Sequence, residues 1–244
     1  MRVLTWNLFH GRSLPPAGRA LTTEFAMRID GWEWDIALLQ EVPPWWPPQL
    51  ARRTGAEQHT ALTSRNAALA LRQALAERWP DLIKSNGGGC NAILARTTIA
   101  EHRAVRLRIW PERRVAQLAR LRDGTCLVNF HGSAHKAFAE AELEHLWKLT
   151  LAWAGDAPVI LGGDLNLRSP RAPDNSIAHI AHHSVDHLFA RGLEPFTETH
   201  LLDRRVMLDE GHHVELSDHV PLIASPMRRQ RATTKPAGLM PELA

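Results

Sequence analysis

Polar side chains that suit acid–base chemistry and metal binding recur in this sequence at the ends of apolar runs. LTW leads to Asn7, IALL leads to Gln40 and Glu41, and VILGG leads to Asp164. A carboxylate at the end of a buried strand is costly unless it is paired or bound to a cation. Because loops meet at one rim of a sandwich, we expect the whole set to converge on one site. The set comprises Asn7, Glu41, His131, Asp164, Asn166, Asp186, Asp218 and His219.

This combination of carboxylate, amide and imidazole groups suits the hydrolysis of a phosphate ester. A phosphodiester is an anion, so it repels hydroxide until a cation offsets its charge. Mg²⁺ is typically bound through one or two carboxylates and keeps waters and substrate oxygens as its other ligands. A further carboxylate can orient the attacking water, and a histidine can donate a proton to an oxygen of the phosphate. The sequence contains no tyrosine, which excludes a mechanism that needs a phenol.

The elements that must position these residues are short strands with few helices among them. PPWWPP, residues 43–48, is expected to be a loop because proline continues neither kind of element. The helical spacing of apolar residues predicts helices over 66–79 and 136–154. Apolar runs predict strands over 2–8, 35–41, 91–96, 104–109, 115–122, 125–131, 158–163, 185–190 and 220–224.

The order of these elements predicts an α+β fold. Strands cluster in hairpins, and a strict alternation of strand and helix is absent, so we expect two mostly antiparallel sheets packed as a sandwich with helices outside. We expect one domain over residues 1–225. The polar residues 226–244 have no periodicity and are expected to form a disordered tail.

Composition narrows the possible classes of protein. Hydrophobic residues make up 44% of the chain and charged residues 23%, which is ordinary for a globular protein and excludes a disordered chain or a disulfide scaffold. No apolar run is long enough to span a membrane. No export signal is recognisable, so we expect a cytoplasmic protein in which Cys90 and Cys126 are reduced, buried thiols. The tail 226–244 carries four basic residues and one acidic residue, so the net charge of +3 lies there and the rest of the chain is neutral.

Seven segments of the sequence, taken in order, resemble the endonuclease/exonuclease/phosphatase superfamily, which has the DNase I-like fold. These segments are TWNLFHG, LLQEV, NAILAR, VNFHG, GGDLNL, SVDHLF and LSDHVPL. The resemblance implies a four-layer α/β/β/α sandwich that hydrolyses phosphate esters with a divalent metal, Mg²⁺ or alternatively Mn²⁺. It covers residues 3 to about 224, and its most specific parts are GGDLN and SDH.

The resemblance also implies a role for each residue of the set. Asn7, Glu41 and Asp218 match the positions that hold the metal. Asp164 matches the residue that orients or deprotonates the water, and Asn166 would hold that water or a phosphoryl oxygen. An extended D-x-N segment would project both of these side chains to the same side.

The remaining residues of the set match the family's histidine positions. His219 matches the histidine that contacts the phosphate, Asp186 would hydrogen-bond to it, and His131 matches a second histidine. AP endonucleases have a tyrosine at this last position, so the sequence argues against a close relationship with them.

Several other motifs carry a functional and a structural interpretation. His179, His182 and His183 favour a histidine-rich loop over a zinc site because no cysteine accompanies them, and His187 favours a solvent-facing side chain. His212 and His213 are interpreted in the same way.

Two further motifs leave both interpretations open. Trp45 and Trp46 either contact a substrate, by stacking on bases or sugars or by inserting into lipid, or only pack their loop against the protein. The arginines at 106, 108, 120 and 122 either contact phosphates or form ion pairs on a solvated or helix-covered outer face, and we favour the outer face with ion pairs slightly.

We therefore expect a divalent-metal-dependent phosphoesterase acting on phosphodiester bonds, with nucleic acid as the default substrate and a monomer as the assumed state. Two alternatives stay open. One is a phosphatase or phosphodiesterase that acts on a lipid or a small phosphorylated metabolite. The other is a binding module of the same fold without catalytic activity.

Overall fold

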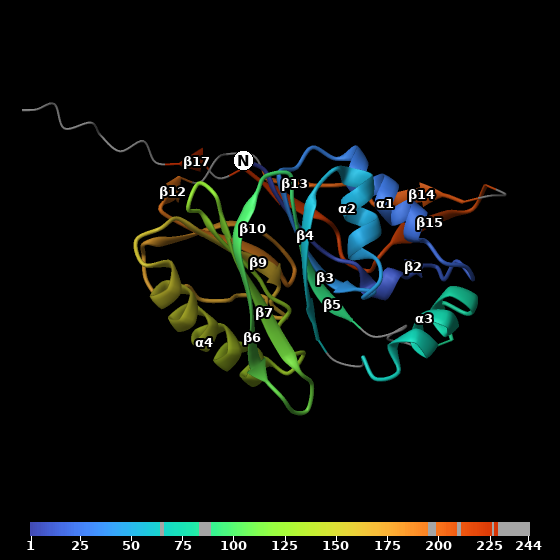
Figure 1. Cartoon of the computed structure of the whole chain (residues 1–244), viewed down its shortest axis with the longest axis horizontal. Coiled ribbons are helices and arrows are strands. Elements are labelled where there is room, and N and C mark those ends of the chain that lie inside the picture. The colour runs from blue at the N-terminus through green and yellow to red at the C-terminus, as the bar shows by residue number, and fades with distance from the viewer. Residues whose placement is uncertain (64–65, 83–88, 195–198, 209–210, 226, 229–244) are drawn as a thin grey trace, which may run out of the picture.

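The computed structural model describes residues 1–63, 66–82, 89–194, 199–208, 211–225 and 227–228. Two six-stranded sheets pack face to face, and helices cover their outer faces (Figure 1). Helices α1 (Thr22–Gly31) and α2 (Pro47–Thr54) cover the first sheet, whereas α4 (Lys136–Ala154) runs along the second. The predicted four-layer sandwich is therefore confirmed.

The first sheet has the strand order β13-β16-β1-β3-β5-β4. Strands β1 and β3 are parallel, and the other neighbours are antiparallel. The strands are β1 (Val3–Asn7), β3 (Ile36–Val42), β4 (Glu57–Leu62), β5 (Cys90–Ala95), β13 (Thr199–Leu201) and β16 (Leu222–Ala224).

The second sheet has the order β10-β11-β9-β8-β7-β6, in which only β8 and β9 are parallel. Its strands are β6 (Ile99–Arg108), β7 (Arg114–Leu121), β8 (Cys126–Asn129), β9 (Val159–Asp164), β10 (Ile177–His183) and β11 (Asp186–Arg191).

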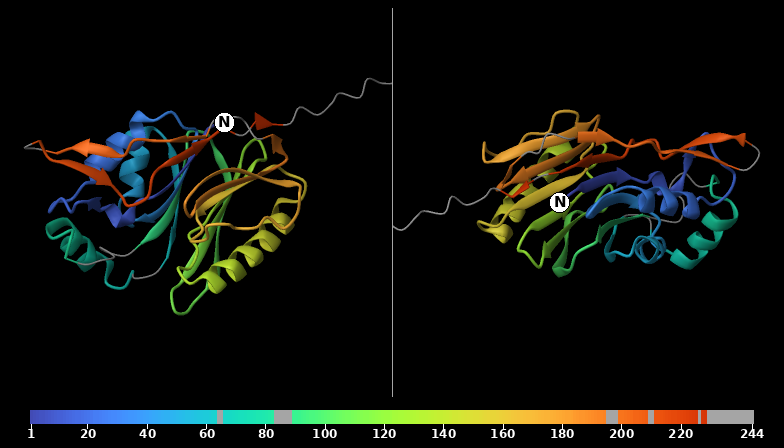
Figure 2. Two further views of the ribbon diagram at one scale, coloured as in Figure 1. Left: turned by 180° about the vertical axis from the view of Figure 1, so that it is seen from behind. Right: turned by 90° about the horizontal axis from the view of Figure 1, so that it is seen from above.

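The smaller elements complete the described part of the chain. Strands β2, β14 and β15 form a three-stranded sheet, and Figure 2 shows β14 and β15 beside α1. Strands β12 and β17 pair with each other. These elements are η1 (Phe9–Gly11), β2 (Ser13–Leu14), α3 (Leu69–Arg78), β12 (Leu193–Glu194), β14 (Arg205–Met207), β15 (His213–Leu216) and β17 (Met227–Arg228).

Alternation along the strands divides the core into layers. On β1, Val3 packs between the two sheets, whereas Leu4 and Trp6 pack against α1 and α2. On β9, Ile160 faces the first sheet, whereas Leu161 faces α4. Side chains in step with Val3 and Ile160 therefore point into the layer between the sheets. The polar residues that end these two strands, at positions 7 and 164, are in step with them.

Three features of the fold differ from the sequence-based expectations. The segment 43–48 is not all loop, because α2 begins at Pro47, where proline's missing N–H is one of the donors that a helix leaves unpaired anyway. The histidines at 179–183 lie on strand β10 rather than in a loop. Residues 227–228 of the expected tail form β17. Residues 226 and 229–244 lie outside the described residues.

Two other expectations can be compared directly with the structure. Cys90 and Cys126 are buried and free of disulfides, as predicted. Trp46 is buried, 5.3 Å from the ring of Phe25, and Trp45 packs against the same cluster, so these tryptophans pack their segment against the core.

None of the described helices is long and apolar enough to cross a membrane.

Candidate active site

The strand ends that point into the layer between the sheets open into a cavity of about 280 Å³. Asn7 ends β1, Asp164 ends β9, and His131 follows β8 in step with the inward-facing Asn129. The structure brings seven of the eight predicted residues to the wall of this cavity, and the eighth, Asp186, lies behind His219. The cavity is lined by Asn7, Phe9, His10, Glu41, Thr63, Glu112, Arg113, Arg114, His131, Ala134, Asp164, Asn166, Asp218 and His219.

The carboxylate of Asp164 lies at the centre of this group. Its Oδ2 accepts a hydrogen bond from Asn7 Nδ2 at 2.9 Å, and it lies 3.5 Å from His131 Nε2 and 3.7 Å from His219 Nε2. Burial raises the pKa of Asp164 above its ordinary value, which makes it a better proton acceptor than an exposed carboxylate.

Glu41 reaches the cavity because β3 is irregular at its end. The pairing of β3 with β5 shifts register between Leu39 and Val42, and Glu41 has a φ of 50°, in the left-handed region. Such a conformation is uncommon for a residue with a side chain, and it turns Glu41 out of the regular alternation. Its Oε1 lies 3.8 Å from His131 Nε2, and its Oε2 lies 3.1 Å from His10 Nε2. Burial, followed by the nearby negative charge of Asp218, raises the pKa of Glu41.

His219 and Asp186 form a close pair at one side of the cavity. His219 Nδ1 lies 2.8 Å from Asp186 Oδ2, and the Asp186 side chain is 2% exposed. Burial raises the pKa of Asp186 to about 6. Burial alone would lower the pKa of His219, but the hydrogen bond and the charge of Asp186 raise it to about 9. At pH 7 the pair is therefore an imidazolium and a carboxylate, and Nε2 of His219 carries a proton.

The other histidine, His131, has the opposite protonation state. Burial, reinforced by the positive charge of Arg114, lowers the pKa of His131 well below its ordinary value. A neutral imidazole can accept or donate one hydrogen bond at Nε2, depending on its tautomer. The cavity thus combines a protonated histidine and a neutral histidine, each within 3.7 Å of Asp164 Oδ2.

Asn166 lies at the cavity for a different reason from the one predicted. Strand β9 ends at Asp164, and Asn166 has a left-handed φ of 53°, so no extended segment aligns the two side chains. Instead, the backbone N–H of Asn166 donates to Asp164 Oδ1 at 3.0 Å, and its Nδ2 donates to Gly132 O at 3.0 Å. An Asx turn therefore places Asn166 beside the carboxylate.

Asp218 lies at the margin of the cavity. Its side chain is 41% exposed, and Oδ1 is 3.9 Å from His219 Nε2. Ser217, with a φ of 68°, positions this segment, because its Oγ donates to Asn7 O at 2.6 Å and accepts from the His219 N–H at 3.0 Å. The SDH segment is thereby attached to the end of β1.

Buried amides hold the two sheets in register behind the cavity. Gln40 Nε2 donates to Asn129 Oδ1 at 2.8 Å, and Asn129 Nδ2 donates to Gln117 Oε1 at 3.1 Å. All three side chains are buried. Because Gln40 precedes Glu41 and Asn129 lies two residues before His131, this network fixes the strands that carry both site residues.

Sequence reasoning missed two residues of the site, His10 and Arg114. His10 lies in η1, which follows directly from TWN, and its contact with Glu41 depends on the irregular end of β3. Arg114 begins β7; its Nη2 donates to Glu112 Oε2 at 2.6 Å, and its buried Nε has no hydrogen-bond partner in the described part of the chain. Neither residue stands at the end of an apolar run. Only the packing of the two sheets shows that they belong to the site.

The remaining motifs lie away from the cavity. His187 is buried rather than solvent-facing, because it points to the outer face of the second sheet, where Nε2 lies 2.6 Å from Leu167 O. Arg108 pairs with Glu142 and stacks 4.0 Å from the ring of Phe138, and Arg120 lies over Trp153. For these two arginines, a covered outer face with ion pairs is the correct interpretation.

Comparison with known proteins agrees with this geometry. Residues 4–219 match the profile of the Endonuclease/Exonuclease/phosphatase family. The chain belongs to this family. A search of curated protein sequences finds no match.

Several solved structures of the endonuclease/exonuclease/phosphatase fold are similar to this chain. Truncated TDP2 from Caenorhabditis elegans is 18% identical with a TM-score of 0.68, over 93% of this chain and 96% of that chain. A mannosyl-6-phosphatase from Bacteroides thetaiotaomicron is 14% identical with a TM-score of 0.70, over 93% of this chain and 99% of that chain. A conserved protein of unknown function from Enterococcus faecalis is 16% identical with a TM-score of 0.67, over 94% of this chain and all of that chain. At these identities the likeness establishes the fold.

The donors at the cavity fit the divalent metal that members of this family commonly use. Burial and Asp218 leave the charge of Glu41 poorly compensated, as its raised pKa indicates, and a cation would compensate it. Carboxylate and amide oxygens are the ligands that Mg²⁺ prefers, and it needs only one or two carboxylates because it keeps several waters. Among the described residues, no three acidic, histidine or cysteine side chains already form a closed metal site. The donor set therefore suits Mg²⁺ better than a tightly caged zinc ion.

Proposed function

We propose that this protein hydrolyses phosphodiester bonds with the help of a divalent cation and that its substrate is a nucleic acid. One observation carries the proposal: Glu41, His131, Asp164 and His219, from four distant parts of the sequence, surround one cavity. A purely structural ion-pair network would not need two histidines in opposite protonation states beside a carboxylate with a raised pKa.

Each residue has a distinct task in this reaction. Asp164 accepts a proton from the attacking water, and Asn166 orients that water or a phosphoryl oxygen. Protonated His219 donates from Nε2 to an oxygen of the phosphate while Asp186 holds its ring from Nδ1. Arg114, whose buried Nε has no hydrogen-bond partner among the described residues, adds positive charge beside the phosphate.

Glu41, Asn7 and Asp218 would hold the cation, either Mg²⁺ or Mn²⁺. When bound, the cation would reduce the negative charge of the phosphate and act as a Lewis acid. The same carboxylates repel a phosphate when no cation is bound. Activity is therefore expected to depend on added metal.

Bis-p-nitrophenyl phosphate provides the first test. We expect hydrolysis with Mg²⁺ or Mn²⁺ and none after EDTA, with recovery when metal is restored in excess. Activity that persists in EDTA would contradict the metal dependence. No hydrolysis of any diester under any metal condition would overturn the proposed function.

A second candidate function is the removal of phosphate from a small phosphorylated metabolite. It is favoured by the small cavity, by the neutral charge of residues 1–225 and by the similarity in fold to a mannosyl-6-phosphatase. p-Nitrophenyl phosphate distinguishes the two, because hydrolysis of this monoester alone would indicate a phosphatase. A panel of DNA, RNA, inositol phosphates and phospholipids would then separate the substrates. Binding without hydrolysis across the whole panel would favour a non-catalytic module.

A further inference from the structure

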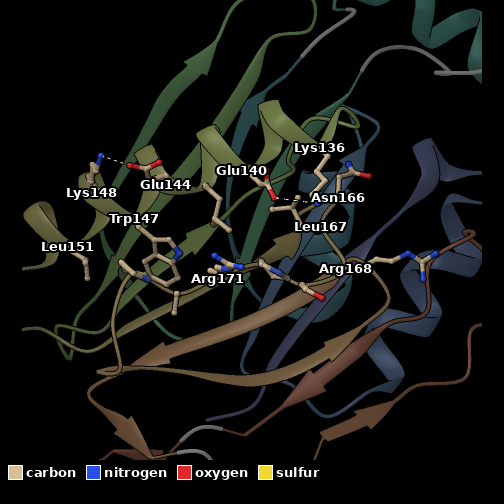
Figure 3. Close-up of a pocket in the computed structure, with 15 residues that line it drawn as sticks. Lys136, Glu140, Glu144, Trp147, Lys148, Leu151, Asn166, Leu167, Arg168 and Arg171 are labelled. Carbon is tan, nitrogen blue, oxygen red and sulfur yellow. Dashed lines mark hydrogen bonds and ion pairs between the residues drawn. The ribbon is translucent and has the colours of Figure 1, made fainter.

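A second, larger hollow lies on the outer face of the second sheet, between α4 and the segment 166–173 (Figure 3). Its volume is about 990 Å³, more than three times that of the catalytic cavity. Leu143, Trp147 and Leu151 from α4 and Leu167 from the segment give it an apolar floor. We call this hollow the α4 groove.

The charged side chains of the α4 groove are unequally compensated. On α4, Lys148 Nζ donates to Glu144 Oε1 at 2.7 Å, and Lys136 Nζ lies 3.8 Å from Glu140 Oε1. Within each of these two pairs the positive and the negative charge compensate each other. Arg171, across the groove, is exposed and has no ion pair or hydrogen bond within the described part of the chain. Arg168, which also lines the groove, is likewise exposed and has no ion pair or hydrogen bond among the described residues, but in the view of Figure 3 its side chain extends away from α4. The guanidinium that the groove presents beside its apolar floor is therefore that of Arg171.

The indole of Trp147 is a second sign that the groove takes a ligand. Trp147 is 2% exposed, yet its Nε1 has no hydrogen-bond partner among the described residues. A buried donor without an acceptor is costly, and native structures contain few of them. In the view of Figure 3 this nitrogen is on the side of the ring that faces Arg171. An acceptor on a ligand in the groove would satisfy it once the exposed Arg171 side chain moves.

The α4 groove and the catalytic cavity share a lining residue. Asn166, two residues after Asp164, lines both. The chain leading into α4 makes a second connection, because Ala134, two residues before the helix, lines the cavity and Lys136, its first residue, lines the groove. A substrate whose scissile phosphate lies at Asp164 can therefore extend past Asn166 into the groove.

We propose that the α4 groove binds the nucleotide next to the scissile bond. The base lies on the apolar floor and accepts a hydrogen bond from Trp147 Nε1, while Arg171 holds the neighbouring phosphate. This combination of a planar apolar group, an acceptor and an anion matches what the groove presents. The inference rests on the proposed function, because it assigns the substrate class of the same site.

The test measures binding, so that it does not depend on turnover. A fluorescein-labelled thymidine oligonucleotide is titrated with the Asp164→Asn protein in Mg²⁺ over a series of salt concentrations, and fluorescence anisotropy reports Kd. Adding Arg171→Gln should raise Kd about tenfold and reduce the slope of log affinity against log salt by about 0.7, as expected for one lost phosphate contact to a single strand. Arg52→Gln is the matched control, because Arg52 is an exposed arginine on α2, in the opposite layer.

Trp147→Phe tests the hydrogen bond separately from the charge. Phenylalanine keeps a ring against Phe189, whose centroid lies 5.7 Å from that of Trp147 in an edge-on arrangement, but removes the N–H. We expect Kd to rise several-fold, the salt slope to stay unchanged and the unfolding midpoint to stay close to that of the parent protein.

Three outcomes would overturn the inference: no binding of the oligonucleotide by the parent, an effect of Arg171→Gln no larger than that of Arg52→Gln, or an unchanged salt slope. Failure of the proposed function has a different signature, which is wild-type protein that hydrolyses no phosphodiester. In that case the comparison of Kd values still shows whether the groove binds the oligonucleotide. If wild type is active, Arg171→Gln should lower kcat/KM for the oligonucleotide about tenfold. The kcat/KM for bis-p-nitrophenyl phosphate, which has no second phosphate for Arg171 to hold, should change by less than about twofold.

Discussion

The cavity at Asp164 and the α4 groove share the lining residue Asn166 but differ in nearly every physical property: strand ends and the residues that follow them line the cavity, whereas a helix and a loop line the groove. The cavity is small, polar and crowded, and its carboxylates and histidines already contact one another. The groove is larger, has an apolar floor and presents the guanidinium of Arg171, which has no ion pair or hydrogen bond with any described residue. The cavity is therefore suited to moving protons, whereas the groove is suited to binding a substrate over a large area.

Strand β11 shows how one sheet supports both. Asp186 and Leu188 point into the layer between the sheets, whereas His187 and Phe189 point outward under α4. Consecutive residues thus serve opposite faces, and a shift of pairing by one residue would exchange them. A substitution at an inward-facing position should therefore affect the cavity, and one at an outward-facing position should not. The substitutions below test whether the two faces are independent.

The largest effect is expected from Asp164→Asn. Asparagine keeps the shape but cannot accept a proton, so kcat should fall by at least about 10²-fold. The unfolding midpoint should change little or rise, because burial disfavours the charge that is removed. Asp156→Asn, an exposed carboxylate beyond the end of α4, serves as the control. Retention of more than a tenth of wild-type activity would remove Asp164 from the reaction.

Asp186→Asn should change the pH dependence of kcat. Asp186, followed by the charges of Asp164 and Asp218, outweighs burial and raises the pKa of His219 to about 9. In the wild type His219 therefore stays protonated up to that pH, and activity falls as pH rises through it. Without the carboxylate the pKa of His219 falls, and the alkaline limb of kcat should move to lower pH, with a loss at pH 8 of about tenfold or more. An unshifted alkaline limb would mean that His219 is not the proton donor.

Arg114→Gln also tests the cavity rather than the groove, and its effect should be smaller than the two above. Removing a positive charge beside the phosphate should lower kcat/KM about tenfold for diesters of any size, short or long. Arg171→Gln, by contrast, should affect only substrates that reach the groove. If both substitutions lowered activity equally on short and long substrates, the separation of cavity and groove would fail.

The smallest effect is expected from His187→Gln, on the outer face. Burial lowers the pKa of His187 to about 4, so the folded protein resists its protonation. Below the ordinary histidine pKa of about 6.5 the unfolded chain takes up this proton first, and stability is lost progressively as pH falls toward about 4. Glutamine cannot titrate, so the Tm advantage of the wild type over the variant should shrink between pH 7 and pH 4.5. A difference in Tm that is independent of pH would contradict this.

The sequence predicts those parts of the site that depend on alternation along strands. Asn7, Asp164 and Asp186 each lie in step with apolar residues of the inner layer, and that pattern can be read from the sequence alone. Apolar runs predict the strands of the two sheets, and the helical spacing of apolar residues predicts the long helix α4. The period of two also explains why a buried histidine can follow a buried aspartate on β11.

Other parts could not be predicted, for physical reasons that lie outside local sequence. Glu41 and Asn166 reach the cavity through left-handed backbone that breaks the alternation. Arg114 and His10 contribute only because two separate segments pack against the site. The histidines of β10 were misjudged because an edge strand with one exposed face can carry as many polar residues as a loop.

The central claim is that one cavity holds both a cation and the phosphate. Its most direct test is a crystal structure of the Asp164→Asn protein grown with Mn²⁺ and a thymidine dinucleotide, with the metal located by its anomalous scattering. The account predicts an anomalous peak at the carboxylate of Glu41, with the phosphate between residue 164 and His219. Metal and phosphate bound elsewhere, with this cavity holding neither, would contradict it.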